Sequence, residues 1–189
     1  APGSCQVETW HARRGRDAEQ TAVAPGCHFA GAEWSLFGLD ARQDGERRRS
    51  VAVQGKWLLR AIEPGGLGVA LVAGGGAESR AGRLSEVFAY LPLSIEPTDS
   101  LRVHLNLGGL RDRDAKQWTA TWGLGFDWAL ASRLHVLGER FGDGTGDSGW
   151  QLGLRPVLFE DRLHLDLVHG RNVDGIRGGW WTLGTVWAF

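Results

Sequence analysis

Residues 118–130 read WTATWGLGFDWAL, and this stretch decides the fold class. Apolar side chains occupy every even position from Trp118 to Leu130, whereas threonine, glycine and aspartate fill most of the odd positions. A period of two is the period of a β-strand, whose successive side chains point to opposite faces. The run is far longer than the common soluble strand of ~5–6 residues and reaches the ~9–11 residues that cross a bilayer at a tilt.

The same alternation recurs along the chain. Residues 101–108 place leucine and valine opposite Arg102, His104 and Asn106, and residues 163–169 place leucines opposite His164 and Asp166. No segment carries a sustained helical stripe, and no stretch approaches the ~18 consecutive apolar residues of a membrane helix. The sequence therefore predicts an all-β protein.

The two faces of these strands differ in an unusual way. One face combines glycine, threonine and charges of both signs, as in the lumen of a barrel, and the other is almost continuously apolar and rich in tryptophan. The chain has 189 residues with 29 glycines, 10 tryptophans and no methionine. Tryptophan gathers where membrane meets water. We therefore predict that residues 1–189 form a single domain, a closed antiparallel transmembrane β-barrel. A soluble β-sandwich or lipocalin-like binder is the alternative fold.

Turn signals divide the chain into about twelve strands, with ten as the alternative. Tight turns are predicted at residues 63–66, 97–100, 131–133 and 160–162, and longer polar loops at 43–49, 74–82, 109–116, 142–149 and 171–178. The predicted strands are 5–13, 19–28, 33–41, 50–62, 67–73, 85–95, 101–109, 117–130, 133–141, 149–158, 162–170 and 179–189. An even number leaves both ends on the periplasmic side, with short turns there and long loops outside.

The two cysteines support the weakest part of this assignment, the first hairpin. If the hairpin turns at residues 15–17, Cys5 lies opposite Cys27. A disulfide there fits the oxidising periplasm; the alternative is two free buried thiols. We expect any signal peptide to have been removed, since no charged and then apolar leader opens the chain.

The chain ends Trp181-x-Leu183-x-Thr185-x-Trp187-x-Phe189, which resembles the C-terminal assembly signature of Gram-negative outer-membrane β-barrels. That resemblance implies a bacterial outer-membrane location and insertion by the barrel-assembly machinery. The opening Cys5-Gln6-x-Glu8-x-Trp10, followed by Pro25-x-Cys27-x-Phe29, also resembles a group of small proteobacterial outer-membrane proteins of unsettled function.

Alternation assigns side chains to the two faces of the barrel. The predicted lumen-lining set, which would set the selectivity of a pore, is Gln54, Lys56, Arg60, Glu86, Tyr90, Arg102, His104, Asn106, Asp127, His135, Glu139, Gln151, Arg155, His164 and Asp166. The predicted membrane-facing aromatic residues are Trp57, Trp118, Trp122, Trp128, Trp150, Trp181, Trp187 and Phe189. Within the first set, the hairpin about residues 160–161 places Arg155 across from Asp166 as an ion pair.

Two functions are compatible with such a lumen. The first is a narrow passive pore for ions or small solutes. The second is a structural barrel, or one that binds another outer-membrane or periplasmic protein, whose interior is plugged by paired charges. We expect no enzymatic activity, because no Gly-x-Ser-x-Gly elbow appears and no outward-facing histidine lies beside a serine. No cofactor is expected, and the acidic glycine-rich stretch 142–149 lacks the pattern of a calcium loop.

The distribution of charge suggests the remaining partners. The 21 basic and 22 acidic residues nearly cancel, which argues against nucleic acid. Arginines concentrate in the predicted outer loops and strand tips, where they would meet the phosphates of lipopolysaccharide. The candidates for this contact are Arg47, Arg48, Arg49, Arg111 and Arg113, and Arg80 and Arg177 belong to the same basic rim.

Overall fold

The computed structural model of the chain describes residues 3–63, 65–79, 82–159, 162–174 and 178–189. Within them the structure has twelve strands. Their bounds are β1 (Cys5–Arg14), β2 (Ala18–Phe29), β3 (Ala32–Gln43), β4 (Glu46–Arg60), β5 (Leu67–Glu78), β6 (Glu86–Thr98), β7 (Leu101–Asp112), β8 (Gln117–Ala131), β9 (Leu134–Asp143), β10 (Ser148–Leu158), β11 (Leu163–Asp174) and β12 (Gly178–Ala188). None of the described residues belongs to a helix that is long and apolar enough to cross a membrane.

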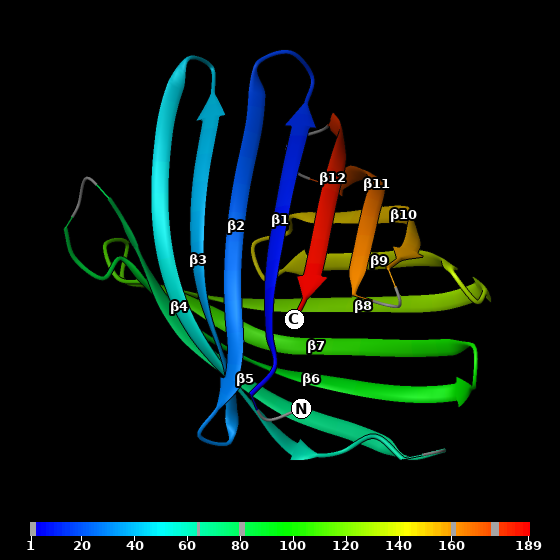
Figure 1. The fold of residues 1–189 in the computed structure, drawn as a ribbon. Coiled ribbons are helices and arrows are strands. Elements are labelled where there is room, and N and C mark those ends of the chain that lie inside the picture. Colours follow the sequence, from blue (N-terminus) through cyan, green and yellow to red (C-terminus); the bar gives the residue numbers. More distant parts are fainter. Residues whose placement is uncertain (1–2, 64, 80–81, 160–161, 175–177) are drawn as a thin grey trace.

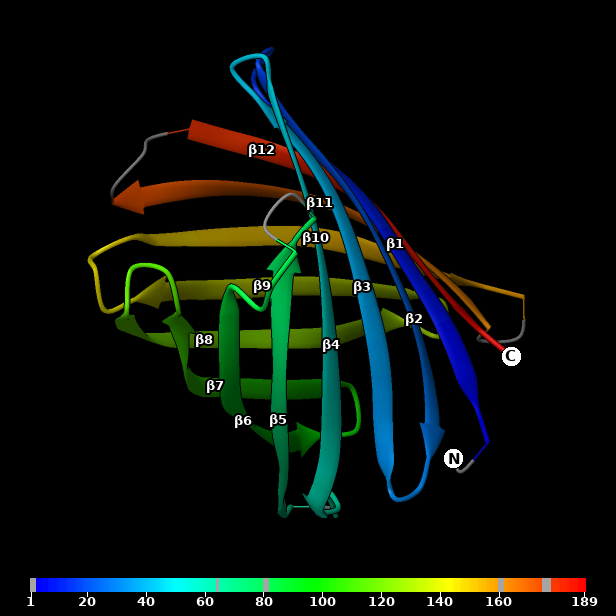
Figure 2. The same ribbon diagram turned by 90° about the vertical axis from the view of Figure 1, so that its left-hand side faces the viewer.

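Each strand pairs with its sequence neighbours, and β1 pairs antiparallel with β12, so the sheet closes into a barrel. Figure 1 shows the blue β1 beside the red β12 at this seam, and Figure 2 shows the other strands curving around the wall. Closure leaves no exposed sheet edge. The all-β closed barrel and the count of twelve strands are confirmed, and the ten-strand alternative is wrong.

Both chain ends lie at the same end of the barrel, which we call the terminal end; the opposite end, with the β1–β2 and β3–β4 turns, is the hairpin end. The N–H of Cys5 donates to the carbonyl of Phe189, and the N–H of Phe189 donates to the carbonyl of Cys5. The predicted turns at 63–66 and 160–162 include residues 64 and 160–161, which lie outside the described part, as do Arg80 and Arg177.

The long outer loops predicted at 43–49, 74–82, 109–116, 142–149 and 171–178 are wrong over much of their length. β3 and β4 are joined by Asp44 and Gly45 alone, whose φ angles of 51° and 84° suit a two-residue hairpin turn. The triple glycine Gly74–Gly76 lies inside β5 and pairs with β6. Polar or glycine-rich composition resembles a loop, yet backbone pairing continues as long as a neighbouring strand supplies partners.

Glycines give the barrel wall room for large cross-strand side chains. Tyr90 of β6 lies against Gly108 of β7, and the indole of Trp180 lies against Gly170. A side chain at either glycine would meet these neighbours, whereas an aromatic ring laid over a glycine fills the wall without crowding it. This packing accounts for glycines inside strands that otherwise have strand-forming residues.

Two adjacent glycines of β7 test this packing. A Cβ at Gly108 would lie 2.5 Å from the carbonyl oxygen of Ala89, whereas a Cβ at Gly109 would meet nothing nearer than 3.4 Å. We expect Gly108→Ala to lower the free energy of unfolding by about 1–3 kcal/mol because backbone cannot move aside cheaply. Gly109→Ala should change it by less than about 0.5 kcal/mol. Urea unfolding in detergent, followed by tryptophan fluorescence, measures both; equal losses would contradict the explanation.

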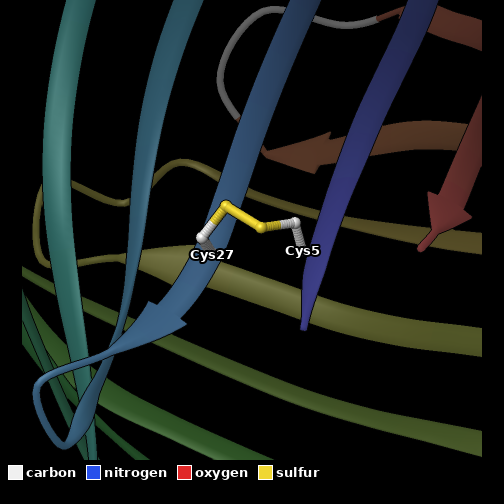
Figure 3. The surroundings of a disulfide bond; sticks show 2 residues. All are labelled: Cys5 and Cys27. Carbon is white, nitrogen blue, oxygen red and sulfur yellow. A yellow bond between two sulfur atoms is a disulfide. The ribbon is translucent and has the colours of Figure 1, made fainter. Parts of the chain in front are cut away.

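The first hairpin has the predicted register. Cys5 pairs with Cys27 across β1 and β2, and the two form a disulfide with Cα atoms 4.1 Å apart. Figure 3 shows this bond spanning the two strands near the terminal end. The predicted disulfide is confirmed.

Candidate functional site

Three cavities occupy the barrel lumen and share walls. The largest, of about 740 Å³, lies toward the hairpin end, and the other two have volumes of about 380 and 280 Å³. Glu139, Gln151 and Asp166 line both the first and the second cavity, Glu8 lines the first and the third, and Asn106 lines the second and the third. Neighbouring cavities therefore lie side by side in the lumen and border on the same side chains.

An arginine that lines the second cavity contacts two lumen aspartates. Arg155 of β10 donates from Nε to Oδ1 of Asp166 at 2.6 Å and from Nη2 to Oδ2 at 2.7 Å. Its Nη1 lies 3.5 Å from Oδ2 of Asp127, whose other oxygen lies 2.5 Å from Nδ1 of His135. The paired geometry toward Asp166 is the two-pronged arrangement that guanidinium and carboxylate favour. One cation thus joins β8, β10 and β11 across the lumen wall.

Two other lumen carboxylates have no such partner. Glu8 accepts a hydrogen bond from the amide of Gln6 at 2.9 Å, and Glu139 accepts one from the amide of Gln151 at 2.7 Å. Neither makes an ion pair with a described residue, whereas Glu33 lies 3.8 Å from Nζ of Lys56. The two lie at the junctions between the first cavity and its neighbours. They place uncompensated negative charge where the cavities meet.

The charged side chains that line the second and third cavities, which we call the inner lumen, are not balanced in number. Among the described residues that line the second and third cavities, two side chains are cationic and five are carboxylates. The cations are Lys56 and Arg155, and the carboxylates are Glu8, Glu33, Asp127, Glu139 and Asp166. Carboxylates therefore outnumber cations in the described lining of these two cavities.

Aromatic side chains form part of the lining of the lumen cavities. Trp10 meets Phe37 with ring centres 6.4 Å apart, and Phe141 meets Trp180 at 6.1 Å. The guanidinium of Arg14 lies 5.2 Å from the ring centre of Trp180, within cation–π range. Rings held by one another and by a cation form a firm wall rather than a flexible plug.

Most of the predicted lumen set lies where alternation placed it. Cavity-lining positions are held by Gln54, Lys56, Tyr90, His104, Asn106, Asp127, Glu139, Gln151, Arg155 and Asp166. Arg102 pairs with Glu96 near the terminal end, and Nδ1 of His104 lies 2.8 Å from Oγ of Ser94. His135 joins the Arg155 network through Asp127, and His164 lies opposite Val157 and Val186. These positions are geometric; their roles in selectivity stay predictions.

One member of the predicted set, Arg60, lies on the other face of the wall. The pairing of β4 with β5 shifts between Leu58 and Arg60, so Arg60 pairs with Val69 and its side chain is exposed. The bulge breaks the alternation on which its assignment depended. Glu86 lies on the same inward face of β6 as Tyr90 and pairs with Asp112 near the hairpin end, but it lines none of the three cavities.

Sequence reasoning missed Glu8, Glu33 and the inward-facing Trp10. The first hairpin alternates poorly because its outward face includes Thr9, His11 and Arg13, so hydropathy alone does not distinguish its faces. The structure decides the faces of β1: Glu8, Trp10 and Ala12 line the first cavity, so the even-numbered residues point inward and Cys5 points outward.

The predicted membrane-facing aromatic residues point away from the lumen. Exposed fractions are 62% for Trp118, 61% for Trp187 and 69% for Phe189. Trp57 is half-buried, because it packs edge-on against Trp34 with ring centres 5.5 Å apart. The remaining members, Trp122, Trp128, Trp150 and Trp181, are also exposed. Such an outer surface would be insoluble in water and suits hydrocarbon bounded by interfacial indoles.

The arginines predicted to contact lipopolysaccharide differ in their surroundings. Arg47 and Arg49 both hydrogen-bond the carboxylate of Asp40, which lies above the apolar band of β3 and β4. Arg111 lies 5.6 Å from the ring centre of Trp118, and Arg48 and Arg113 are exposed. Arg47 and Arg49 thus already have an anionic partner.

The stretch 142–149 is a compact turn. The Asp143 carboxylate accepts hydrogen bonds from the backbone N–H groups of Thr145 and Asp147 and from the Thr145 hydroxyl. Among the described residues, no group of three or more His, Cys, Asp or Glu side chains is placed to hold a metal ion. In this turn the carboxylate caps backbone donors.

Comparison with known proteins places this barrel. A family model described as "Uncharacterised conserved protein UCP029691" matches residues 1–189, so the chain belongs to that family. No curated protein matches the sequence.

Among solved structures, the KdgM porin in complex with disordered oligogalacturonate superposes with a TM-score of 0.79 at 15% identity, covering 97% of this chain and 99% of that one. The NanC porin gives 0.71 at 9% identity, covering 97% and 98%. Acinetobacter baumannii Omp33 gives 0.59 at 10%, covering 99% and 98%. The fold is that of an outer-membrane β-barrel of the KdgM and NanC porin type.

Proposed function

We propose that this member of the UCP029691 family forms a narrow, passive pore in the bacterial outer membrane that favours cations and small neutral solutes over anions. The observation that carries the proposal is the uncompensated charge of Glu8 and Glu139 where the lumen cavities meet. The likeness to KdgM and NanC porins supports the pore, and the acidic lining supports its selectivity.

The ligand of the KdgM structure argues for a different solute here. That porin was solved with oligogalacturonate, a sugar chain with a carboxylate on each unit. A polyanion of this kind needs a cationic track, whereas five carboxylates and two cations line the inner cavities of this barrel. Repulsion and lost hydration would both oppose its passage. Oligogalacturonate should therefore neither block nor traverse this pore.

Planar-bilayer recording tests the proposal. A reversal potential in a KCl gradient should show that K⁺ permeates better than Cl⁻. Glu8→Gln combined with Glu139→Gln should lower the K⁺-to-Cl⁻ permeability ratio several-fold, because these carboxylates lack a cationic partner. Asp114→Asn is the matched control, since Asp114 is exposed and pairs with Arg83 outside the lumen; it should leave the ratio unchanged.

The alternative function is a structural or partner-binding barrel, and it predicts a different result in planar-bilayer recording. The ion pairs of Arg155 and Lys56 would then close the lumen, and properly folded protein would conduct no current under any condition. Such silence, or an anion preference, would overturn the proposed cation pore.

The same proposal includes the insertion of the barrel into the outer membrane. Trp181, Leu183 and Trp187 of β12, and Phe189 directly after this strand, point outward and are each more than half exposed. This apolar face suits recognition by the barrel-assembly machinery. Both ends of the chain would then face the periplasm, and the hairpin end would face the cell exterior.

A further inference from the structure

The outward face of β9–β12 near the hairpin end combines cations with indole rings. Arg140, Trp150 and Arg171 occupy neighbouring positions on one cross-strand row. On the next row toward the terminal end, His169 lies beside Trp181. We call these five residues the β9–β12 patch; Arg13 of β1 lies at its margin, opposite Trp181.

The aromatic part of the patch is firmly held. The imidazole of His169 has its ring centre 4.6 Å from that of Trp181 and 5.9 Å from that of Trp150. Its Nδ1 lies 3.0 Å from the carbonyl oxygen of Trp180, and its ring lies against Gly179, where a Cβ would be only 3.2 Å away. A surface fixed in this way loses little conformational entropy when a ligand binds.

The cations of the patch lack carboxylate partners. Arg140 donates from Nη2 to the hydroxyl of Ser148 at 3.0 Å, and its buried Nη1 has no hydrogen-bond partner in the structure. Asp174 lies one hydrogen bond further on, accepting from Ser148 at 2.6 Å. Among the described residues, no acidic side chain forms an ion pair with Arg140 or Arg171. Arg140 and Arg171 therefore carry positive charge that no carboxylate in the described part of the chain balances, and an anion beside them would supply the missing partner.

Leucines occupy outward positions beside the rings of the patch and below them, toward the middle of the apolar band. Leu152, Leu154, Leu167 and Leu183 are about half exposed, at 50%, 48%, 50% and 59%. From the hairpin end inward, the surface therefore presents a row with two arginines on either side of an indole, then a row with leucine, imidazole and indole side chains, and then a row of leucines. This order matches a molecule with an anionic phosphate, a sugar ring and acyl chains.

We propose that the β9–β12 patch is a binding site for the phosphorylated lipid A part of lipopolysaccharide, with Arg140 and Arg171 holding a phosphate and the tryptophans and leucines lying against the sugar and acyl chains. This inference depends on the outer-membrane location of the proposed function but not on conduction. It moves the principal lipid contact away from Arg47 and Arg49, which both already pair with Asp40.

Native mass spectrometry of the full chain in detergent, titrated with bisphosphorylated lipid A, tests the site. Arg140→Gln combined with Arg171→Gln should weaken binding at least about tenfold, since two charge-assisted contacts are lost. The matched control, Arg47→Gln with Arg49→Gln, removes the same charge from the same end of the barrel and should weaken binding less than about twofold. Equal losses in both variants would overturn the proposal in favour of diffuse electrostatic attraction.

Two further ligands distinguish the contribution of the phosphate groups to binding from that of the rest of the lipid. Lipid A stripped of its phosphates should bind the unchanged protein as weakly as bisphosphorylated lipid A binds the double variant. Inorganic phosphate alone should not compete at the same concentration, because it lacks the parts that meet the rings and leucines; saturation by inorganic phosphate would overturn the lipid assignment. Heat-modifiable gel migration verifies that the variants are folded. Their conductance in bilayers should be unchanged, so failure of this site and failure of the pore are distinguishable.

Discussion

Replacing Arg155 with glutamine should both destabilise the barrel and make its lumen more cation-selective. Arg155 holds Asp166 by two hydrogen bonds and also approaches Asp127, and the side chains of this group are only 17–27% exposed. Removing the cation leaves two neighbouring carboxylates uncompensated. Breaking a fully buried pair costs about 3–5 kcal/mol; because the lumen contains room for water, we expect a loss of about 2–3 kcal/mol.

Urea unfolding in detergent measures the stability of this variant, and bilayer recording measures its selectivity. The K⁺-to-Cl⁻ permeability ratio should rise, because one of two inner cations has gone. Arg83→Gln is the control: Arg83 pairs with Asp114 on the exposed surface, where such a pair contributes about 0–1 kcal/mol.

A double variant separates the ion pair from a general packing effect. Adding Asp166→Asn to Arg155→Gln removes the stranded charge along with its partner, so about half or more of the lost stability should return. If the double variant is instead less stable than Arg155→Gln, the uncompensated carboxylate is not the cause of the lost stability. The lumen network would then matter through packing alone.

Loss of the Cys5–Cys27 disulfide should have an effect of similar size by a different route. The bond joins cysteines 22 positions apart, and closing a loop of this length in the unfolded chain is worth about 3 kcal/mol in the chain-entropy account. It also fixes the start of β1, the strand that closes the barrel against β12. We expect Cys5→Ser with Cys27→Ser to lower the free energy of unfolding by about 2–3 kcal/mol.

Reductant provides the matched comparison for the disulfide. The unchanged protein should lose the same stability when its disulfide is reduced, whereas the double serine variant should not respond to reductant. Thiol titration of the unfolded protein, with and without reductant, verifies the oxidation state. A reduced protein as stable as the oxidised one would show that strand pairing alone holds the first hairpin.

The acidic lumen gives these predictions a common basis. Glu8 of β1 lies far in the sequence from Glu139 of β9 and Asp166 of β11, yet all three line the first cavity. Removing an unpaired carboxylate should change selectivity with little effect on stability, whereas removing the paired Arg155 should change both. This contrast distinguishes charges that hold the barrel together from charges that face permeating ions.

The sequence by itself determined the fold class, the number of strands, the pairing of Cys5 with Cys27 and the face of most strand residues. It could do so because a period of two assigns each side chain to one side of a wall, and a wall between lipid and water makes the two sides chemically unlike. Only the tertiary structure decided where strands end, as at Asp44 and Gly45, since backbone pairing does not depend on side-chain polarity. It also decided that the bulge before Arg60 removes that residue from the lumen, that Glu8 faces inward, and which arginines have a carboxylate partner. Those properties depend on the register and spacing of neighbouring strands, which the alternation within one strand does not contain.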